Sequence, residues 1–504
     1  MAARRMCMKS LGRRISHISR DIVNQNFLIR TYGTPTASAY KPDRPNQDLQ
    51  EYVEIPSYPE IIDSSKEGRK KHARKQWYKY VQELPTVEQK LLEIISRQKY
   101  PAVILGPVSR SYDLLPFQQY CTRTNIIKGL PEIYQGTNVD DVYDKLKQQL
   151  IEVVKVQCCQ FSRNYKITQQ KPTEETVSRG QGGGVLDEMT SLISTTLAVS
   201  DEGQHLANAE ISHLPRCDAF WWHAGFEKSK ITLVKDIDDI CFQYVDQPWL
   251  QVRTKNPLPE IFNQDDPACL GNDIPPVKYH PRVYGHCIER RYVTSVPGFW
   301  PGSECEYGYM SLHTRDGLVK RAKMVTDIDM EDCINGFGMM ASFGWLVALA
   351  TYQGFTPFNE LTYPLVTQTV ITNGQDWDFF VYQLNTMSFH SDIDHNTHKN
   401  ICWTSGTMRL FEDIVDGEVT GLNDDVFKVF LKFFVQAPKQ QSEFSLKPYT
   451  GEDTRSEEEK IADRERLRRL LSNRPNPFEY KHEVPLWKWI YKRHKDAPSA
   501  PFLK

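Results

Sequence analysis

The sequence lacks the short motifs that define the best-known catalytic and nucleotide-binding sites. It contains no G-x-S-x-G, no H-E-x-x-H and no C-x-x-C pattern. The glycine-rich run RGQGGG at 179–184 is not followed by Lys-Ser or Lys-Thr, so it is not a P-loop. We interpret this run as a flexible linker. These absences exclude the enzyme classes that such motifs identify.

The chain also lacks a large charge excess and any pattern of paired cysteines. Its formal net charge is −2, and its 40% hydrophobic and 25% charged residues are ordinary for a soluble globular protein. Of the eleven cysteines, only Cys158 and Cys159 are adjacent, and adjacent cysteines rarely bridge. This pattern favours a reduced intracellular compartment over a disulfide framework.

Only one long hydrophobic run needs to be tested against a membrane. Cys333–Tyr352 is 20 residues long without a charge, which is the length of a membrane-spanning helix. It contains Asn335 and several glycines, among them Gly338 and Gly344, and it has no clear basic flank. We therefore predict the buried central helix of a large domain, without integral membrane insertion.

The N-terminus, residues 1–32, is basic and poor in acids. It holds seven Lys/Arg and one acid, Asp21, with serines between aliphatic residues. Such a segment is typical of a mitochondrial transit peptide, the alternative being a disordered basic arm. Cleavage before Gly33 would leave a mature chain with a net charge near −8. That charge does not suit a broad grip on phosphate backbone, so we expect local RNA contacts and extensive protein contacts.

The remaining chain divides into four regions that differ in composition and sequence pattern. Residues 33–65 are proline-rich and read as an extended arm, 66–219 as a mainly helical region, 220–438 as an α+β core, and 439–504 as a C-terminal extension. We predict an α+β fold with a mixed, mostly antiparallel sheet, packed helices, and extended N- and C-terminal arms. There is no internal repeat.

Several elements have strong local signals. The Asn373-Gly374 pair between two β-rich runs, 366–372 and 377–385, predicts a hairpin. We expect 284–292 to join the same sheet as this hairpin. The remaining signals predict helices near 87–95 and 139–159, a helix between the N-cap Asn423 and the stop Pro438, and a tail helix capped by Ser456 and Glu459.

Many colinear pieces between Lys75 and Pro438 resemble a known family. They include WYKYVQELPTVEQKLLEI, QQYCTRTNIIKGLP, DIDDICFQYVDQ, VTQTVITNGQDWDFFVYQLNT, HKNICW and GLNDDVF. The chain is similar to metazoan mitochondrial ribosomal proteins of the programmed cell death protein nine family. The resemblance implies a non-catalytic structural constituent of the mitochondrial large ribosomal subunit in the matrix, without a cofactor. It also implies contacts with large-subunit rRNA and with large-subunit proteins, including a related paralogous subunit.

One basic stretch, 66–80, has the composition of an RNA-binding surface. It holds seven Lys/Arg against one acid, with aromatic residues interleaved. The candidate RNA-contact residues are Arg69, Lys70, Lys71, Arg74, Lys75, Trp77 and Lys79. The alternative is an amphipathic helix that packs on a protein partner. The tail segment 487–495 has a similar composition and lies outside the resemblance.

One cluster has the composition of a metal site, namely His390, Asp392, Asp394, His395, His398 and Cys402. No spacing in it fixes a ligand geometry, so we interpret it as a solvated polar loop. We likewise assign the acid runs 236–240 and 327–332 to a strand edge or a helix start, and His286 to a hydrogen-bonded structural role. The second hypothesis for function is a soluble matrix metal-dependent hydrolase that uses the 390–398 cluster.

Overall fold

The computed structural model describes most of the chain after the predicted arm. The described residues are 63–108, 114–168, 172–226, 239–271, 273–322, 330–392, 396–440 and 445–472. The predicted transit peptide, almost all of the predicted arm, and the 487–495 segment lie outside them. The expectations for those segments therefore stay predictions.

A five-stranded sheet forms one layer of the protein. In spatial order its strands are β7 (Ile288–Arg291), β1 (Tyr100–Leu105), β5 (Ile240–Asp246), β4 (Cys217–His223) and β8 (Val296–Pro297). Only the β1–β5 pairing is parallel in this sheet. Strands β1, β5 and β4 at its centre are largely buried on both faces, which agrees with their mainly apolar sequences, whereas the edge strand β7 (IERR) is only partly buried.

A seven-stranded sheet forms a second layer. Its strands, in spatial order, are β2 (Thr124–Lys128), β12 (Asn400–Arg409), β11 (Asp376–Leu384), β10 (Leu365–Thr372), β9 (Tyr307–Thr314), β6 (Leu250–Thr254) and β3 (Glu210–His213). The β2–β12 and β9–β10 pairings are parallel and the others antiparallel. A small hairpin, β13 (Asp413–Val415) and β14 (Glu418–Thr420), stands apart. The predicted mixed, mostly antiparallel α+β class is confirmed.

The described residues also contain ten α-helices. They are α2 (Lys66–Glu83), α3 (Val87–Arg97), α4 (Leu114–Thr122), α5 (Glu132–Gln135), α6 (Asp140–Thr168), α7 (Glu174–Leu197), α8 (Asp316–Ala322), α9 (Met330–Tyr352), α10 (Asp424–Val435) and α11 (Glu457–Leu471). Short 3-10 turns lie at Asp201–Asn208, Pro267–Cys269 and Pro281–Tyr284. The helices predicted near 87–95 and 139–159 are α3 and α6.

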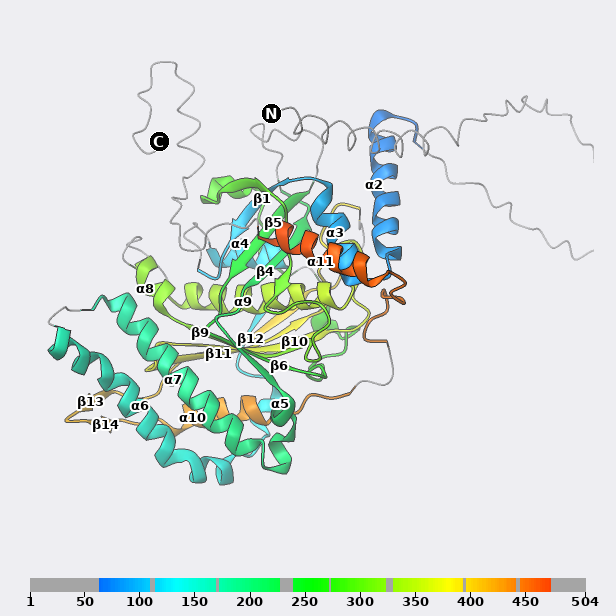
Figure 1. Ribbon diagram of the computed structural model, residues 1–504. Coiled ribbons are helices and arrows are strands. Elements are labelled where there is room, and N and C mark those ends of the chain that lie inside the picture. The colour runs from blue at the N-terminus through cyan, green and yellow to red at the C-terminus, as the bar shows by residue number, and fades with distance from the viewer. Residues whose placement is uncertain are drawn as a thin grey trace, which may run out of the picture. The chain divides into compact units, whose positions relative to one another are not determined.

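Helix α9 lies between the two sheets (Figure 1). The whole of its apolar stretch is buried within the protein, as predicted for Cys333–Tyr352. Its glycines allow the close approach. A Cβ at Gly338 would lie 2.4 Å from the ring of Phe380 in the seven-stranded sheet, and one at Gly344 would lie 2.3 Å from Tyr244 in the five-stranded sheet. A helix of membrane-spanning length is thus the core of this fold.

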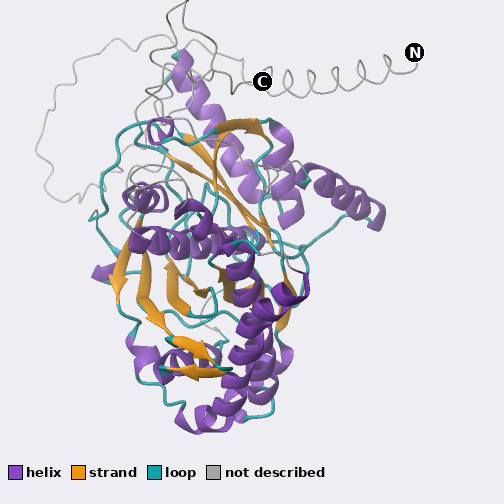
Figure 2. Ribbon diagram, turned by 90° about the vertical axis from the view of Figure 1, so that its left-hand side faces the viewer, coloured by secondary structure: helices purple, strands orange, loops and turns teal. Residues whose placement is uncertain are grey.

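The outer faces of both sheets are covered by helices (Figures 1 and 2). Helices α6, α7 and α10 cover the seven-stranded sheet, and aromatic side chains such as Phe379 and Phe430 fill the space between. On the five-stranded sheet, Val81 of α2 and Ile94 of α3 pack against Trp222 of β4. Burial of these apolar surfaces supplies most of the driving force for folding.

Local signals correctly predicted the hairpin and the helix caps. Strands β10 and β11 pair from Leu365↔Leu384 to Thr372↔Trp377, and Gly374 adopts φ +97° in the turn. Asn373 does not share this conformation; its side chain instead accepts hydrogen bonds from the backbone of the next turn residues. The side chain of Asn423 caps α10 by accepting from Asp425 N.

The tail helix α11 begins with the predicted capping box. Ser456 Oγ accepts from Glu459 N, and a Glu459 carboxylate oxygen accepts from Ser456 N. Just before this helix, Arg455 donates to Glu88 of α3 at 3.0 Å, and Arg464 of α11 donates to the same carboxylate at 3.1 Å. The described part of the C-terminal extension is therefore docked on α3 and does not form an extended arm.

The prediction of a flexible linker at 179–184 is wrong, because the whole run lies inside α7. Two of its glycines face close neighbours. A Cβ at Gly182 would stand 2.7 Å from the carbonyl oxygen of Thr372, and one at Gly183 would stand 2.3 Å from the Trp249 ring. The glycines let α7 pack directly on the hairpin turn and on Trp249, and this packing outweighs their low helix propensity.

Two expectations about organisation are also corrected. The boundary expected between 219 and 220 falls inside β4, and β1 and β2 from the first region pair with β5 and β12 from the second. The two regions therefore share both sheets. In the same way, β7 (Ile288–Arg291) joins the five-stranded sheet, whereas the 365–384 hairpin belongs to the seven-stranded sheet.

Candidate nucleic-acid interface on helix α2

Helix α2 carries all of the candidate RNA-contact residues, and it places them on two different faces. Its N-cap is Ser65, whose hydroxyl accepts from Gly68 N at 3.0 Å. Five candidates are exposed, namely Arg69, Lys70, Lys71, Lys75 and Lys79. Two others, Arg74 and Trp77, are half-buried. The helical repeat of 3.6 residues explains this split, since Arg74, Trp77 and the buried Val81 follow one another at i+3 and i+4.

Arg74 is bound within the protein. Its Nε donates to Asp392 Oδ2 at 2.7 Å and its Nη2 donates to Asp392 Oδ1 at 2.8 Å, which is the two-bond geometry that guanidinium and carboxylate prefer. The Asp392 side chain is only 4% exposed, and Lys71 Nζ lies 4.0 Å from it. Arg74 thus anchors α2 and does not present its guanidinium to a ligand.

Trp77 is also an interior contact. Its indole N–H donates to Glu93 of α3 at 2.9 Å, and the Arg97 guanidinium lies 4.1 Å from the centre of its ring. Phe358 packs beside it with ring centres 5.3 Å apart. Since an RNA base stacks on an open aromatic face, Trp77 is not placed to receive one.

A buried lysine fixes the other end of α2. Lys90 of α3 is 2% exposed and donates to the carbonyl oxygens of Val81 and Gln82 at 3.2 and 2.6 Å. Burial lowers the pKa of Lys90 to about 8. These bonds satisfy carbonyls that the end of α2 would otherwise leave without partners. Helix α2 is therefore fixed at its centre by Arg74 and at its C-terminal end by Lys90.

The residues that point away from the protein form a stripe. Helical geometry places Arg69, His72, Lys75, Gln76 and Lys79 on the side opposite Arg74 and Val81, and all of them are exposed. Half of the Tyr80 side chain is exposed beside them. We call Arg69, His72, Lys75, Gln76, Lys79 and Tyr80 the outer stripe of α2. It combines cationic groups with one accessible aromatic ring.

The candidate metal cluster lies partly beneath α2, where His390 and the Asp392 side chain are buried. His390 is 4% exposed. The centre of its ring lies 5.4 Å from the centre of the Tyr78 ring of α2. Burial lowers the pKa of His390 to about 4. Its Nδ1 accepts from Asp392 N at 3.3 Å. The prediction of a solvated loop is wrong at these positions because α2, remote in sequence, covers them.

The other members of that cluster do not complete a metal site. Asp394 and His395 lie outside the described residues. Cys402 is fully buried in β12, and burial raises the pKa of its thiol. His398 forms an isolated bridge with Leu270. Among the described residues, no three His, Cys, Asp or Glu side chains are grouped as metal ligands.

The acid runs have structural surroundings where the structure describes them. In the first, Asp239 accepts hydrogen bonds from Ser391 N and Ser391 Oγ, and burial raises its pKa. In the second, Glu331 lies in the first turn of α9, where a negative charge is favourable, and Lys128 Nζ lies 2.9 Å away. Residues 236–238 and 327–329 lie outside the described residues.

His286 is buried, but among the described residues its side chain lacks the hydrogen bonds that the sequence predicted for it. Its ring stacks on Phe117 with centres 4.4 Å apart, and neither ring nitrogen has a hydrogen-bond partner in the described part of the chain. Burial lowers the pKa of His286 to about 3. The side chain is therefore a neutral core residue at physiological pH.

The fold and the outer stripe thus suit a protein that works through contact surfaces. Comparison with known families defines its class, that of the mitochondrial ribosomal proteins, which places it in the mitochondrial matrix as part of the mitoribosome. The chain belongs to the family described as mitochondrial 28S ribosomal protein S30 (PDCD9), whose sequence model matches residues 30–438. The match includes α2 and ends before α11.

This description differs from our expectation in one respect. It names a protein of the small subunit, 28S, whereas the sequence resemblance implied the large subunit. The ribosomal class is common to both.

Proposed function

We propose that this protein is a non-catalytic structural constituent of the mitochondrial large ribosomal subunit and supports mitochondrial translation. The ribosomal family supports the structural role. The colinear sequence resemblance described above supports the large subunit. A related paralogous subunit and other large-subunit proteins are the proposed protein neighbours.

The observation that carries the RNA part of the proposal is the outer stripe of α2. A flexible basic arm would lose conformational entropy on binding, whereas α2 is already fixed by Arg74 and Lys90. Its cations can meet phosphates, and Tyr80 can stack on an unpaired base. The candidates Arg69, Lys75 and Lys79 take this role, while Arg74 and Trp77 hold the helix in place.

The choice of subunit is tested by gradient sedimentation of mitochondrial ribosomes separated into subunits. The protein should migrate with the large subunit and leave it only at high salt. Migration with the small subunit would overturn the large-subunit assignment and leave the ribosomal role intact. Recovery at the top of the gradient at low salt would contradict the structural role itself.

A further inference from the structure

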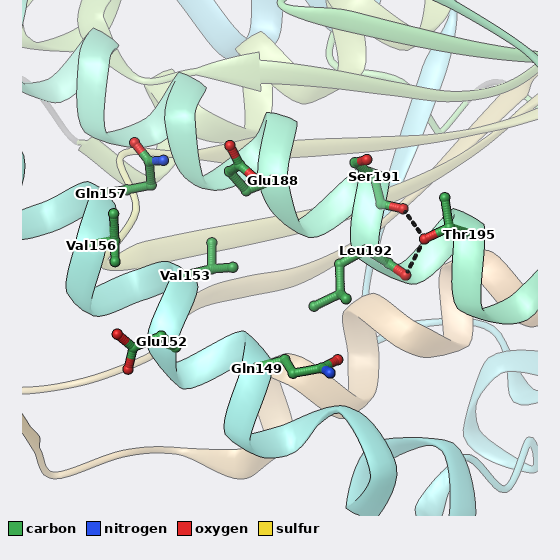
Figure 3. A pocket seen from close by; sticks show the side chains of 9 residues that line it. All are labelled: Gln149, Glu152, Val153, Val156, Gln157, Glu188, Ser191, Leu192 and Thr195. Atoms are coloured by element: carbon green, nitrogen blue, oxygen red, sulfur yellow. Dashed lines mark hydrogen bonds between the residues drawn. The ribbon is translucent and has the colours of Figure 1, made fainter.

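A surface groove runs between helices α6 and α7 (Figure 3). The two helices are antiparallel and approach closely at Gly184, where an added Cβ would lie 2.3 Å from Gln157 Oε1. From there the groove extends to Gln149 and Thr195 and has a volume of ≈ 560 Å³. The nine residues from Gln149 to Gln157 span roughly 12 Å of helix, or about two turns.

The floor of this groove is aliphatic and open to solvent. Val153 and Leu192 are half-buried, and Val156 is 53% exposed. The neighbouring Leu150 and Ile193 point the other way and belong to the core beneath. Val153 and Leu192 contact this core with one part of their side chains and line the groove with another, and Val156 beside them is mostly open to solvent.

The charged residues that line the groove have one sign. Glu152 and Glu188 are exposed there, and no Lys or Arg lines it. The nearby lysines of α6 are directed elsewhere, since Lys147 binds Asp424 of α10 at 2.7 Å and Lys155 binds Glu418 of β14 at 2.6 Å. The groove thus pairs an aliphatic floor with an acidic rim.

The rim does not offer the fixed polar groups that orient a small molecule. The hydroxyl of Thr195 donates to the carbonyl oxygens of Ser191 and Leu192 in its own helix, at 2.8 and 3.1 Å (Figure 3). Specific small-molecule sites are largely enclosed and have several convergent polar groups. An open groove between two parallel ridges of side chains matches instead the surface on which a third helix packs.

We infer that the α6–α7 groove binds an amphipathic basic helix of a partner protein, which completes a three-helix bundle. Aliphatic side chains of that helix would cover Val153, Val156 and Leu192. Lys or Arg one turn before and after them would meet Glu152 and Glu188, so charge complementarity selects the partner. This inference uses the proposed ribosomal function only in the choice of assay.

The test uses the full chain, expressed in cells in place of the endogenous protein, with a benzophenone photo-crosslinking side chain at position 156. After irradiation of purified mitochondrial ribosomes, mass spectrometry should locate the crosslink on one protein. The crosslinked segment should carry Lys or Arg three or four residues on either side of an aliphatic residue. The double variant Glu152→Lys/Glu188→Lys should lower the yield about tenfold.

Two controls match this design. Asp141→Lys/Asp144→Lys makes the same charge change on exposed positions of α6 outside the groove and should leave the yield unchanged. The same probe at Val199, which is 91% exposed and outside the groove, should not capture that segment.

Four results would overturn the groove inference: crosslinks to RNA, to this chain itself or to a segment without basic residues, and a yield insensitive to the Glu152 and Glu188 reversals. Absence of a crosslink in a chain that still sediments with ribosomes would also overturn it, without affecting the proposed function. A chain that fails to sediment with ribosomes would instead contradict the proposed function.

Discussion

Arg74 and Asp392 are 318 residues apart in the sequence and form a two-bond ion pair, with distances of 2.7 and 2.8 Å. The pair joins α2 to the segment that follows β11. It converts a basic helix at the edge of the fold into a surface of fixed orientation. It also helps to bury His390, a member of the candidate metal cluster, which is 4% exposed.

Removal of one partner from this pair should destabilise the protein. Arg74→Met leaves a carboxylate that is 4% exposed without its main counter-charge, and we expect the free energy of unfolding to fall by about 2–3 kcal/mol in urea denaturation. Lys75→Met, on the exposed side of α2, should change it by about 0.5 kcal/mol or less. Equal effects of the two substitutions would contradict the anchoring role.

The outer stripe of α2 should determine how salt affects ribosome binding. The triple variant Arg69→Glu/Lys75→Glu/Lys79→Glu removes cations without breaking the Arg74 anchor. The salt concentration at which the protein leaves the ribosome should fall, because binding that neutralises fewer phosphates releases fewer counterions. Sedimentation over a potassium chloride series measures this change.

A matched control makes the same charge change on exposed lysines elsewhere in the described part of the chain. Lys145, Lys278 and Lys439 serve this purpose as a triple glutamate variant. We expect it to release from the ribosome at the same salt concentration as the unmodified chain. If both triple variants behave alike, net charge and not the α2 stripe governs binding.

In the glycine-rich run inside α7, a Gly→Ala substitution should lower the stability of the protein, although the same substitution usually stabilises a helix. In an exposed helix, Gly→Ala stabilises by about 1 kcal/mol. At Gly183 the new methyl group would meet the Trp249 ring, so we expect Gly183→Ala to lower the free energy of unfolding by about 1–3 kcal/mol. Thr196→Ala, exposed on the same helix, should be neutral or slightly stabilising. Chemical denaturation of the two variants measures the contrast.

His286 should contribute to the loss of stability in acid. Its pKa is about 3 in the folded protein and about 6.5 in the unfolded chain, so between these values the unfolded state binds the extra proton. The stability contribution is complete above pH 6.5 and is lost progressively as the pH falls toward 3. His286→Phe should flatten this part of the pH dependence of unfolding by about one proton.

A second variant separates titration from packing. Phe117→Leu removes the ring on which His286 stacks but keeps the imidazole. It should lower the free energy of unfolding at every pH without changing the slope between pH 3 and 6.5. If His286→Phe leaves the slope unchanged, the group that titrates lies elsewhere.

The sequence predicted elements whose signals lie within a few residues of one another. The Gly374 turn, the Asn423 cap, the Ser456 capping box and the apolar α9 run are of this kind, because local hydrogen bonds or composition determine them. The same local signals also predicted the α+β fold class correctly.

Features that depend on distant contacts could not be predicted in the same way. From the sequence alone, the run 179–184 has the composition of a linker. In the structure, Thr372 and Trp249 pack so closely against it that only glycine fits at 182 and 183. Similarly, Arg74 and Trp77 look like RNA ligands until Asp392 and Glu93 are found as their partners. The division of the outer stripe from the anchoring residues therefore required the three-dimensional structure.

The distance along the chain between Arg74 and Asp392 has a consequence for the order of folding. A chain that is synthesised from its N-terminus exposes α2 long before residue 392 follows. Closing such a long loop is entropically costly and slow, so the helix acquires its partner late. The Arg74 anchor beneath the cationic stripe is therefore completed only after residue 392 has joined the fold, whereas the contacts of α2 with Lys90 and Glu93 are local and can form early.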